Sequence, residues 1–434
     1  MTRQIPMGER LWLTCTILFA WSIATLADEK PSGFSPQKLE AIPAALKKAV
    51  EKKQVAGASA LIARNGQIVH RTTVGLQDIE ANKPISEDTL FRIASMSKPI
   101  TSVAVMILVD DGKLKTTDPL SKFVPEFKEM KVLVPSKDGK SYELVDAKRE
   151  ITIHDLLTHS SGITYRLINK PFVANMYIKA GVSDGLSETP GTMADNVKKL
   201  AKMPLVCQPG SAWEYGLNTD VLGHVVEVVS GKSLEEFFRE RIFEPLKMNN
   251  TFFNVPLEKR SKLSALYSVN PDKSLAAVGN KPVVLGPIVY SATYSSHSDN
   301  RYFSGGAGLV SSVRDYFRFC QMMLNRGELD GTRVLKPETV ERMIRNQLGE
   351  VRIMGPVPGV MGYGFGILTK EGKDASKDPA AVGTYSWGGA FGTSFWIDPQ
   401  NQLVGVFMMQ SFPPDFTLAN EFKRLTYEAM TAEK

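Results

Sequence analysis

The chain has 434 residues, of which 43% are hydrophobic and 23% are charged, so it is long enough to bury a large core. Its formal net charge of +6 is spread along the sequence, without the basic stripes interleaved with aromatic residues that nucleic-acid binding requires. We therefore expect a globular protein whose main partner is neither a nucleic acid nor an anionic membrane surface.

The N-terminus has the layout of a secretory signal peptide. Two arginines precede an apolar run over residues 11–20, and small residues precede a predicted cleavage site after Ala27. An uncleaved anchor is the alternative, but the run is short for a membrane span of about 20 residues. The sequence thus predicts a signal peptide over residues 1–27, a mature chain over 28–434 without a membrane span, and a secreted or periplasmic location.

Cysteine and histidine usage argues against a disulfide framework and against a metal site. The mature chain retains only Cys207 and Cys320, and two separate thiols are favoured over a disulfide between them. Neither cysteine has neighbours at metal-ligand spacing, and the five histidines form no metal-binding motif. We expect no metal and no cofactor.

The first part of the mature chain predicts a helix, a β-hairpin and a second helix. A helical pattern of apolar residues begins at Ser35 and continues to about residue 53. Residues 56–74 predict two strands joined at Asn65-Gly66, which is a strong hairpin turn signal. Apolar residues at helical spacing then predict a largely buried helix over residues 95–110.

The middle of the chain predicts helical segments interrupted by proline and glycine, and the C-terminal part returns to strands. Residues 263–301 show little periodicity, and we expect them to form a loop that faces the substrate. Helices are expected at 153–158, 193–202, 220–239, 313–326 and 417–430, and strands at 363–370, 385–387, 395–397 and 403–410.

Strands near both ends of the chain, with helices between them, predict a composite architecture. We expect one α/β lobe assembled from about residues 28–115 and 300–434. A mainly helical lobe, about residues 116–299, would be inserted into it.

Ser95 is the predicted nucleophile. In Ser95-Met96-Ser97-Lys98, serine and lysine are three residues apart and lie on the same helix face. A catalytic serine needs a base within hydrogen-bond reach, and lysine can serve where burial or a nearby cation lowers its pKa. The pattern alone is not specific, because Ser35-Pro36-Gln37-Lys38 also has it and is explained as a helix start.

Further motifs follow Ser95 in an order that resembles one enzyme family. The stretches are 92–110, 151–162, Trp213-Glu214-Tyr215 through Gly223, 305–311 and Trp387-Gly388-Gly389. Together they strongly resemble the class C β-lactamase-like serine hydrolases, which include β-lactamases, D-alanyl-D-alanine carboxypeptidases and family VIII esterases. The resemblance covers nearly the whole mature chain. It implies the serine β-lactamase/penicillin-binding-protein fold, an antiparallel sheet flanked by helices with an inserted helical lobe.

The resemblance also implies roles for individual residues. Ser95 would be acylated, Lys98 would activate it, and Tyr215 would relay the proton to and from the leaving group. The backbone N–H groups of Ser95 and Ala390 would form the oxyanion hole. Tyr215 could instead be a buried aromatic with a satisfied hydroxyl. The segment His159-Ser160-Ser161-Gly162 is a structural turn in the family, and we expect no catalytic role for it.

Two departures from the β-lactamase pattern favour ester substrates. The family's Tyr-x-Asn becomes Tyr215-Gly216-Leu217, which leaves Asn218, one residue later, as the candidate amide that contacts substrate. The third motif is Trp387-Gly388-Gly389, the form found in family VIII-like esterases, and its three residues are the other candidate substrate contacts. The neutral Trp387 cannot pair with the carboxylate of penicillins and D-alanine termini. Trp387 could also be a strand aromatic that packs between the lobes.

The sequence therefore predicts a secreted serine hydrolase that forms an acyl-enzyme on Ser95. Its expected substrate is a small-molecule carboxylic ester, or an acyl group that it transfers. The alternatives are a D-alanyl-D-alanine carboxypeptidase or β-lactamase acting on cell-wall peptides or β-lactams, and a non-catalytic sensor of cell-wall fragments. The sensor is disfavoured because Ser95, Lys98 and Tyr215 are all present. The acyl-chain preference and the oligomeric state stay open.

Overall fold

The computed structural model describes residues 1–2, 33–166, 168, 170–296, 300–353 and 359–431. The predicted signal peptide therefore lies, apart from its first two residues, outside the described part of the chain. Within that part, no helix is long and apolar enough to cross a membrane.

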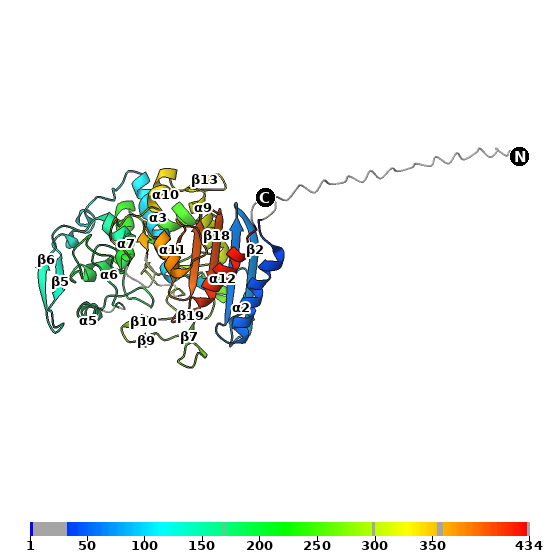
Figure 1. Ribbon diagram of the computed structural model, residues 1–434, viewed down its shortest axis with the longest axis horizontal. Coiled ribbons are helices and arrows are strands. Elements are labelled where there is room, and N and C mark those ends of the chain that lie inside the picture. The colour runs from blue at the N-terminus through cyan, green and yellow to red at the C-terminus, as the bar shows by residue number, and fades with distance from the viewer. Residues whose placement is uncertain (3–32, 167, 169, 297–299, 354–358, 432–434) are drawn as a thin grey trace. The chain divides into compact units, whose positions relative to one another are not determined.

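The fold contains an eight-stranded antiparallel sheet, which lies in the right half of the folded part in Figure 1. Its strand order is β14-β15-β16-β17-β18-β1-β2-β3, so the N-terminal and C-terminal parts of the chain meet where β1 pairs with β18. The strands are β1 Gly57–Arg64, β2 Gln67–Asp78, β3 Lys83–Pro84, β14 Val360–Met361, β15 Gly366–Ile367, β16 Tyr385–Gly389, β17 Thr393–Asp398 and β18 Leu403–Met408.

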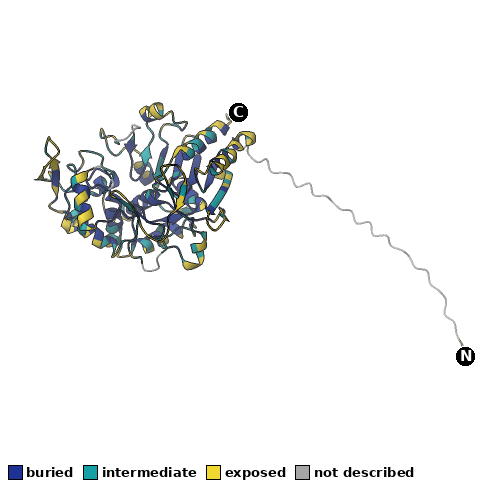
Figure 2. Cartoon of the chain, turned by 90° about the horizontal axis from the view of Figure 1, so that it is seen from below, coloured by how far each residue is buried: buried dark blue, intermediate teal, exposed yellow. Residues whose placement is uncertain are grey.

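Strands β1 and β18 are buried along their whole length, because helices cover both faces of the sheet here (Figure 2). One face packs against α1 (Pro36–Leu39), α2 (Ala41–Glu51) and α12 (Thr417–Ala429), and the other against α9 (Val313–Leu324). The single N-terminal helix that we predicted is divided at Glu40. Pro43 has no N–H to bond the carbonyl one turn earlier, which explains the break.

The helix that follows the nucleophile, α3 (Ser97–Asp110), is buried along most of its length and packs against α7 (Asn218–Ser230). The predicted helix over 220–239 forms as two helices, separated where Gly231 takes the positive φ that ends α7. The helices between residues 116 and 299 are α4 Ile153–Leu157, α5 Pro171–Ala180, α6 Met193–Leu200, α7 Asn218–Ser230 and α8 Leu234–Phe238.

The segment 263–301, which we expected to be a loop, contains four short strands. They are β7 Tyr267–Val269, β8 Leu275–Ala277, β9 Val283–Leu285 and β10 Ile288–Tyr290. Strands of three residues are too short to show a period in the sequence, which explains the error. The predicted strand over 363–370 is likewise reduced to β15.

Short elements complete the fold. A hairpin that was not predicted is formed by β5 and β6, and β4 pairs with β11 directly before the nucleophile. Their bounds are β4 Phe91–Arg92, β5 Lys131–Pro135, β6 Tyr142–Asp146, β11 Val310–Ser311, β12 Glu328–Leu329, β13 Thr332–Arg333, β19 Ser411–Phe412, α10 Pro337–Met343 and α11 Lys370–Ser376.

Candidate active site

Ser95 lies in a 3₁₀ turn, Ala94–Met96, that leads into α3. Ala94 and Met96 are fully buried, whereas Ser95 is partly exposed. Ala94 has a φ of +41°, in the left-handed region that costs a residue with a side chain on the order of 1–3 kcal/mol. The hydroxyl of Tyr316 on α9 donates to the Met96 carbonyl at 2.9 Å and helps to hold this turn in place.

Lys98 follows one turn later and is only 1% exposed. Its Nζ lies 3.2 Å from Ser95 Oγ, 3.0 Å from the Tyr165 hydroxyl and 2.8 Å from the Gly306 carbonyl oxygen. These three contacts use all three donors of an ammonium group, which is what a buried lysine requires. The structure therefore brings Ser95 and Lys98 together as predicted.

The Tyr215 hydroxyl forms a hydrogen bond of 2.8 Å with Ser95 Oγ. Lys98 Nζ lies 4.8 Å from the centre of the Tyr215 ring, close enough for a cation–π contact. Four aromatic side chains surround that ring, with centroid distances of 5.0 Å for His159, 5.3 Å for Tyr165, 5.8 Å for Trp213 and 5.8 Å for Trp387. Ser95, Lys98 and Tyr215 thus form one hydrogen-bonded group.

Tyr165 is a member of this group that sequence reasoning missed. It is buried, and burial raises the pKa of its phenol well above the ordinary value of 10, so it stays protonated. Its oxygen accepts the hydrogen bond from Lys98. In the sequence, what could have indicated that Tyr165 belongs to the site is its position, three residues after the turn that ends at Gly162.

Asp220 on α7 is the second residue that sequence reasoning missed. One carboxylate oxygen accepts hydrogen bonds from Ser304 Oγ at 2.6 Å and from the Gly306 N–H at 3.4 Å. The other oxygen, Oδ2, is buried and has no hydrogen-bond partner among the described residues. Burial raises the pKa of Asp220, and the charge of Lys98 acts against that rise.

Gly306 allows these groups to approach one another. A side chain at Gly306 would lie 2.5 Å from Asp220 Oδ2 and 3.3 Å from the Tyr165 hydroxyl. Its carbonyl oxygen is also the shortest contact of Lys98. A carboxylate, a phenol and an ammonium group therefore surround one glycine.

Strand β16 brings Ala390 close to the nucleophile turn. A Cβ at Gly389 would lie 2.3 Å from the carbonyl oxygen of Ile93, so only glycine fits at this contact. Ala390 then packs against the apolar cluster that contains Ala94. The backbones of Ser95 and Ala390 thus lie in adjoining segments, as the predicted oxyanion hole requires.

Trp387 is partly exposed, lines the site beside Tyr215 and also packs on Gly366, where a Cβ would lie 3.3 Å from its ring. Its position is therefore compatible with both predicted roles, a substrate contact and a strand aromatic that packs inside the protein. The next residue, Gly388, lies on the opposite face of β16, where a Cβ would be 3.2 Å from the ring of Phe416.

Asn218 does not face the site. It is fully buried, and its side-chain oxygen accepts a hydrogen bond from Ser161 Oγ. Its amide nitrogen donates to His159 Nδ1 at 3.0 Å and to the Ile163 carbonyl at 3.2 Å. Because these internal partners occupy the amide, the position contradicts the prediction that Asn218 binds substrate.

His159 supports Tyr215 instead of acting as a base. Burial, together with the charge of Lys98, lowers the pKa of His159 well below 6.5, so the ring is neutral. Since Nδ1 accepts from Asn218, the ring proton is on Nε2. This neutral ring packs against Tyr215.

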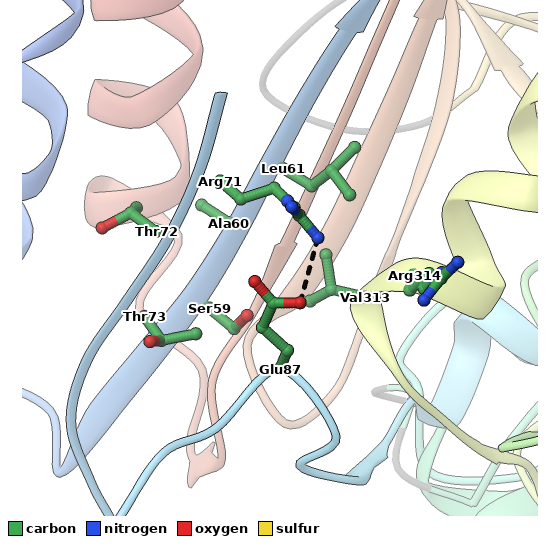
Figure 3. Close-up of a pocket in the computed structure, with 9 residues that line it drawn as sticks. All are labelled: Ser59, Ala60, Leu61, Arg71, Thr72, Thr73, Glu87, Val313 and Arg314. Carbon is green, nitrogen blue, oxygen red and sulfur yellow. Dashed lines mark hydrogen bonds and ion pairs between the residues drawn. The ribbon is translucent and has the colours of Figure 1, made fainter. Parts of the chain in front are cut away.

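The described residues contain no cluster of three or more metal-ligating side chains, and Cys207 and Cys320 are separate free thiols. A pocket between β1, β2 and the start of α9 is lined by Arg71 and Glu87, whose ion pair is 2.9 Å long (Figure 3). This pocket contains none of the predicted site residues.

Comparison with known proteins identifies the family. The model of the Beta-lactamase family matches residues 42–428. The chain belongs to the Beta-lactamase family. It is 34% identical over 383 residues to Esterase EstB of Burkholderia gladioli, covering 86% of this chain and 91% of that protein. It is 30% identical over 381 residues to the lovastatin esterase of Penicillium rubens, covering 83% and 90%.

Among solved structures, the chain resembles EstCE1, described as a hydrolase with promiscuous acyltransferase activity. The TM-score is 0.77 at 26% identity, covering 90% of this chain and 99% of that one. These matches confirm the predicted fold class and the prediction of a serine hydrolase from the esterase branch of the Beta-lactamase family.

The neutral, buried His159 predicts a pH dependence of stability. In the unfolded chain it titrates near 6.5, whereas in the folded chain it resists protonation, so below pH 6.5 the unfolded state binds more protons. The free energy of unfolding should therefore fall on acidification below pH 6.5, by up to ~1.4 kcal/mol per pH unit from this residue. Urea unfolding between pH 7.5 and 5.5 measures this slope.

His159→Gln should reduce this slope. Burial also lowers the pKa of His70 and His154, and these two histidines contribute equally to both proteins. An identical slope in wild type and His159→Gln would contradict the assignment.

Proposed function

We propose that the protein is a secreted carboxylic ester hydrolase or acyltransferase that works through an acyl-enzyme on Ser95. The observation that carries the proposal is the hydrogen-bonded group of Ser95, Lys98 and Tyr215. Two relatives that are named as esterases, and EstCE1 as a hydrolase with acyltransferase activity, support the choice of reaction. Secretion is supported by the signal-peptide layout of the first 27 residues.

In the proposed acylation, ionised Tyr215 removes the proton from the Ser95 hydroxyl, 2.8 Å away. Ser95 Oγ bonds to the ester carbonyl carbon, and the carbonyl π electrons move to oxygen. The N–H groups of Ser95 and Ala390 hold this oxyanion. When the oxyanion collapses, the bond to the alcohol oxygen breaks, and Tyr215 gives its proton to the leaving alcohol.

Deacylation repeats these steps with a new nucleophile. Water, or an acceptor alcohol, gives a proton to Tyr215 and attacks the acyl carbon. The bond to Ser95 Oγ then breaks, and Ser95 takes the proton back from Tyr215. The products are a free acid from water or a new ester from an alcohol. Lys98, which donates a hydrogen bond to Ser95 Oγ, stabilises the anions that form beside it in both steps.

The choice of an ester over a β-lactam or a peptide rests on charge. Penicillins and D-alanine termini present a carboxylate next to the reacting carbonyl, which a cation must recognise. Trp387 has no charge, and Lys98 uses its three donors inside the protein. Neither residue can therefore pair with that carboxylate, whereas a neutral ester needs no such partner.

The substrate ranking tests this proposal. We expect the wild-type protein to hydrolyse p-nitrophenyl butyrate faster than a chromogenic cephalosporin or an acyl-D-alanyl-D-alanine peptide, as measured by kcat/KM. Ser95→Ala should reduce ester hydrolysis roughly a thousandfold or more, because the nucleophile is lost. Ser35→Ala, in the other serine-x-x-lysine run, should leave it unchanged. Faster turnover of the cephalosporin or the peptide would overturn the ranking.

The pH dependence of kcat/KM in an Asp220 variant is a second test of the proposed function. Asp220→Asn removes a negative charge near Lys98 and so favours the deprotonated form of groups that titrate beside it, which should move the acidic limb of kcat/KM to lower pH. The matched control is Asp315→Asn on α9. This aspartate is also buried, but it bonds the Asn250 N–H and the Thr251 hydroxyl. A shift in the control, or none in Asp220→Asn, would contradict the electrostatic role.

A further inference from the structure

The β9–β10 hairpin is an apolar element that extends into solvent. From Pro282 to Val289 the sequence is Pro-Val-Val-Leu-Gly-Pro-Ile-Val, without one polar side chain. Val284 and Leu285 at its tip are 69% and 52% exposed, respectively. The hairpin lies at the lower edge of the molecule in Figure 1. Consecutive exposed apolar residues are unfavourable in water and mark interaction sites.

The base of this hairpin is continuous with the surroundings of the nucleophile. Val283 and Ile288 pack against an apolar cluster that includes Ala94, the residue before Ser95. Ala390, whose N–H belongs to the predicted oxyanion hole, packs against the same cluster. The base of the hairpin and Ala390 thus pack against the same buried apolar cluster.

Aromatic contacts join the hairpin to the residue after Ala390. The ring of Tyr290, the last residue of β10, lies 4.3 Å from that of Phe412. Phe412 in turn lies 6.3 Å from Phe391. These ring contacts, from Tyr290 through Phe412 to Phe391, hold the hairpin in a fixed position relative to the site.

Polar contacts reinforce this position. Arg92, three residues before Ser95, donates to the carbonyl of Ala292, just beyond β10, and to the carbonyl of Ser264 at 2.8 Å. The Ser291 N–H donates to the carbonyl of Leu186 at 2.9 Å. The base of the hairpin is therefore bonded to the strand that carries the nucleophile turn.

We propose that the β9–β10 hairpin binds the acyl chain of the substrate, and that the preferred substrates are esters of medium or long apolar acyl groups. The inference rests on the proposed ester hydrolysis at Ser95. An uncharged hairpin offers nothing to a charged partner, whereas an apolar chain would cover Val284 and Leu285 and remove them from water. The acyl chain stays attached to Ser95 between the two steps, beside the cluster that the hairpin continues.

The test compares two serine double variants on two esters. Val284→Ser/Leu285→Ser removes the exposed side chains of the proposed site. The matched control is Val134→Ser/Leu144→Ser on the β5–β6 hairpin, where the two residues are 38% and 50% exposed. The first variant should lose about tenfold in kcat/KM for p-nitrophenyl octanoate and stay within about twofold of wild type for p-nitrophenyl acetate. The control should match wild type on both esters.

Other outcomes have distinct meanings. Equal losses on both esters, or no loss on the octanoate, would overturn the acyl-chain assignment while leaving ester hydrolysis intact. Weaker sedimentation with phosphatidylcholine vesicles, at unchanged octanoate preference, would make the hairpin a membrane contact and also overturn it. If the wild-type protein hydrolysed neither ester, the proposed function itself would fail.

Discussion

The buried ammonium group of Lys98 is the constraint on which the rest of the site depends. A cation taken out of water is costly unless every donor finds a partner and a negative charge lies nearby. Ser95, Tyr165 and the Gly306 carbonyl supply the partners, and Asp220 supplies the carboxylate. These residues come from segments far apart in the sequence, so the site can form only when the helical segments and the sheet have packed together.

The contacts around α3 show how that packing is achieved. Thr101 on this helix donates to the Gly305 carbonyl at 2.6 Å, and Ser97 accepts from the Leu309 N–H at 3.1 Å. The turn that contains Gly306 is thereby fixed against the helix that carries Lys98. On the other side, Gly389 allows β16 to approach Ile93 closely. In the proposed mechanism, the same arrangement provides the electrostatics for acyl transfer and the backbone donors for an oxyanion.

The sequence alone predicted those site residues that lie close together along the chain. Ser95 and Lys98 could be paired because they are one helical turn apart, whereas Tyr215 and Trp387 were found through resemblance to a family. Tyr165 and Asp220 were missed, since their importance depends on where the tertiary fold places them relative to Lys98. The β9–β10 hairpin was taken for part of a loop, because its strands are too short to show periodicity.

The prediction that Asn218 contacts substrate was wrong because this residue is displaced by one position from the family motif. It lies one residue beyond the position that the family motif gives to the amide, at the start of α7. Successive side chains on a helix differ in direction by about 100°, so one residue is enough to turn an amide from the site into the core. The amide then bonds His159, which supports Tyr215, and Asn218 acts on the site only indirectly.

Formation of an acyl-enzyme on Ser95 is tested most directly by intact-mass spectrometry of protein quenched in acid during turnover of p-nitrophenyl butyrate. The expected result is a mass increase equal to one butyryl group in place of a hydrogen, located by peptide mapping on Ser95 and absent from Ser95→Ala. Turnover by the wild-type protein without this adduct under saturating substrate, or the same adduct on Ser95→Ala, would contradict Ser95 as the acylated nucleophile.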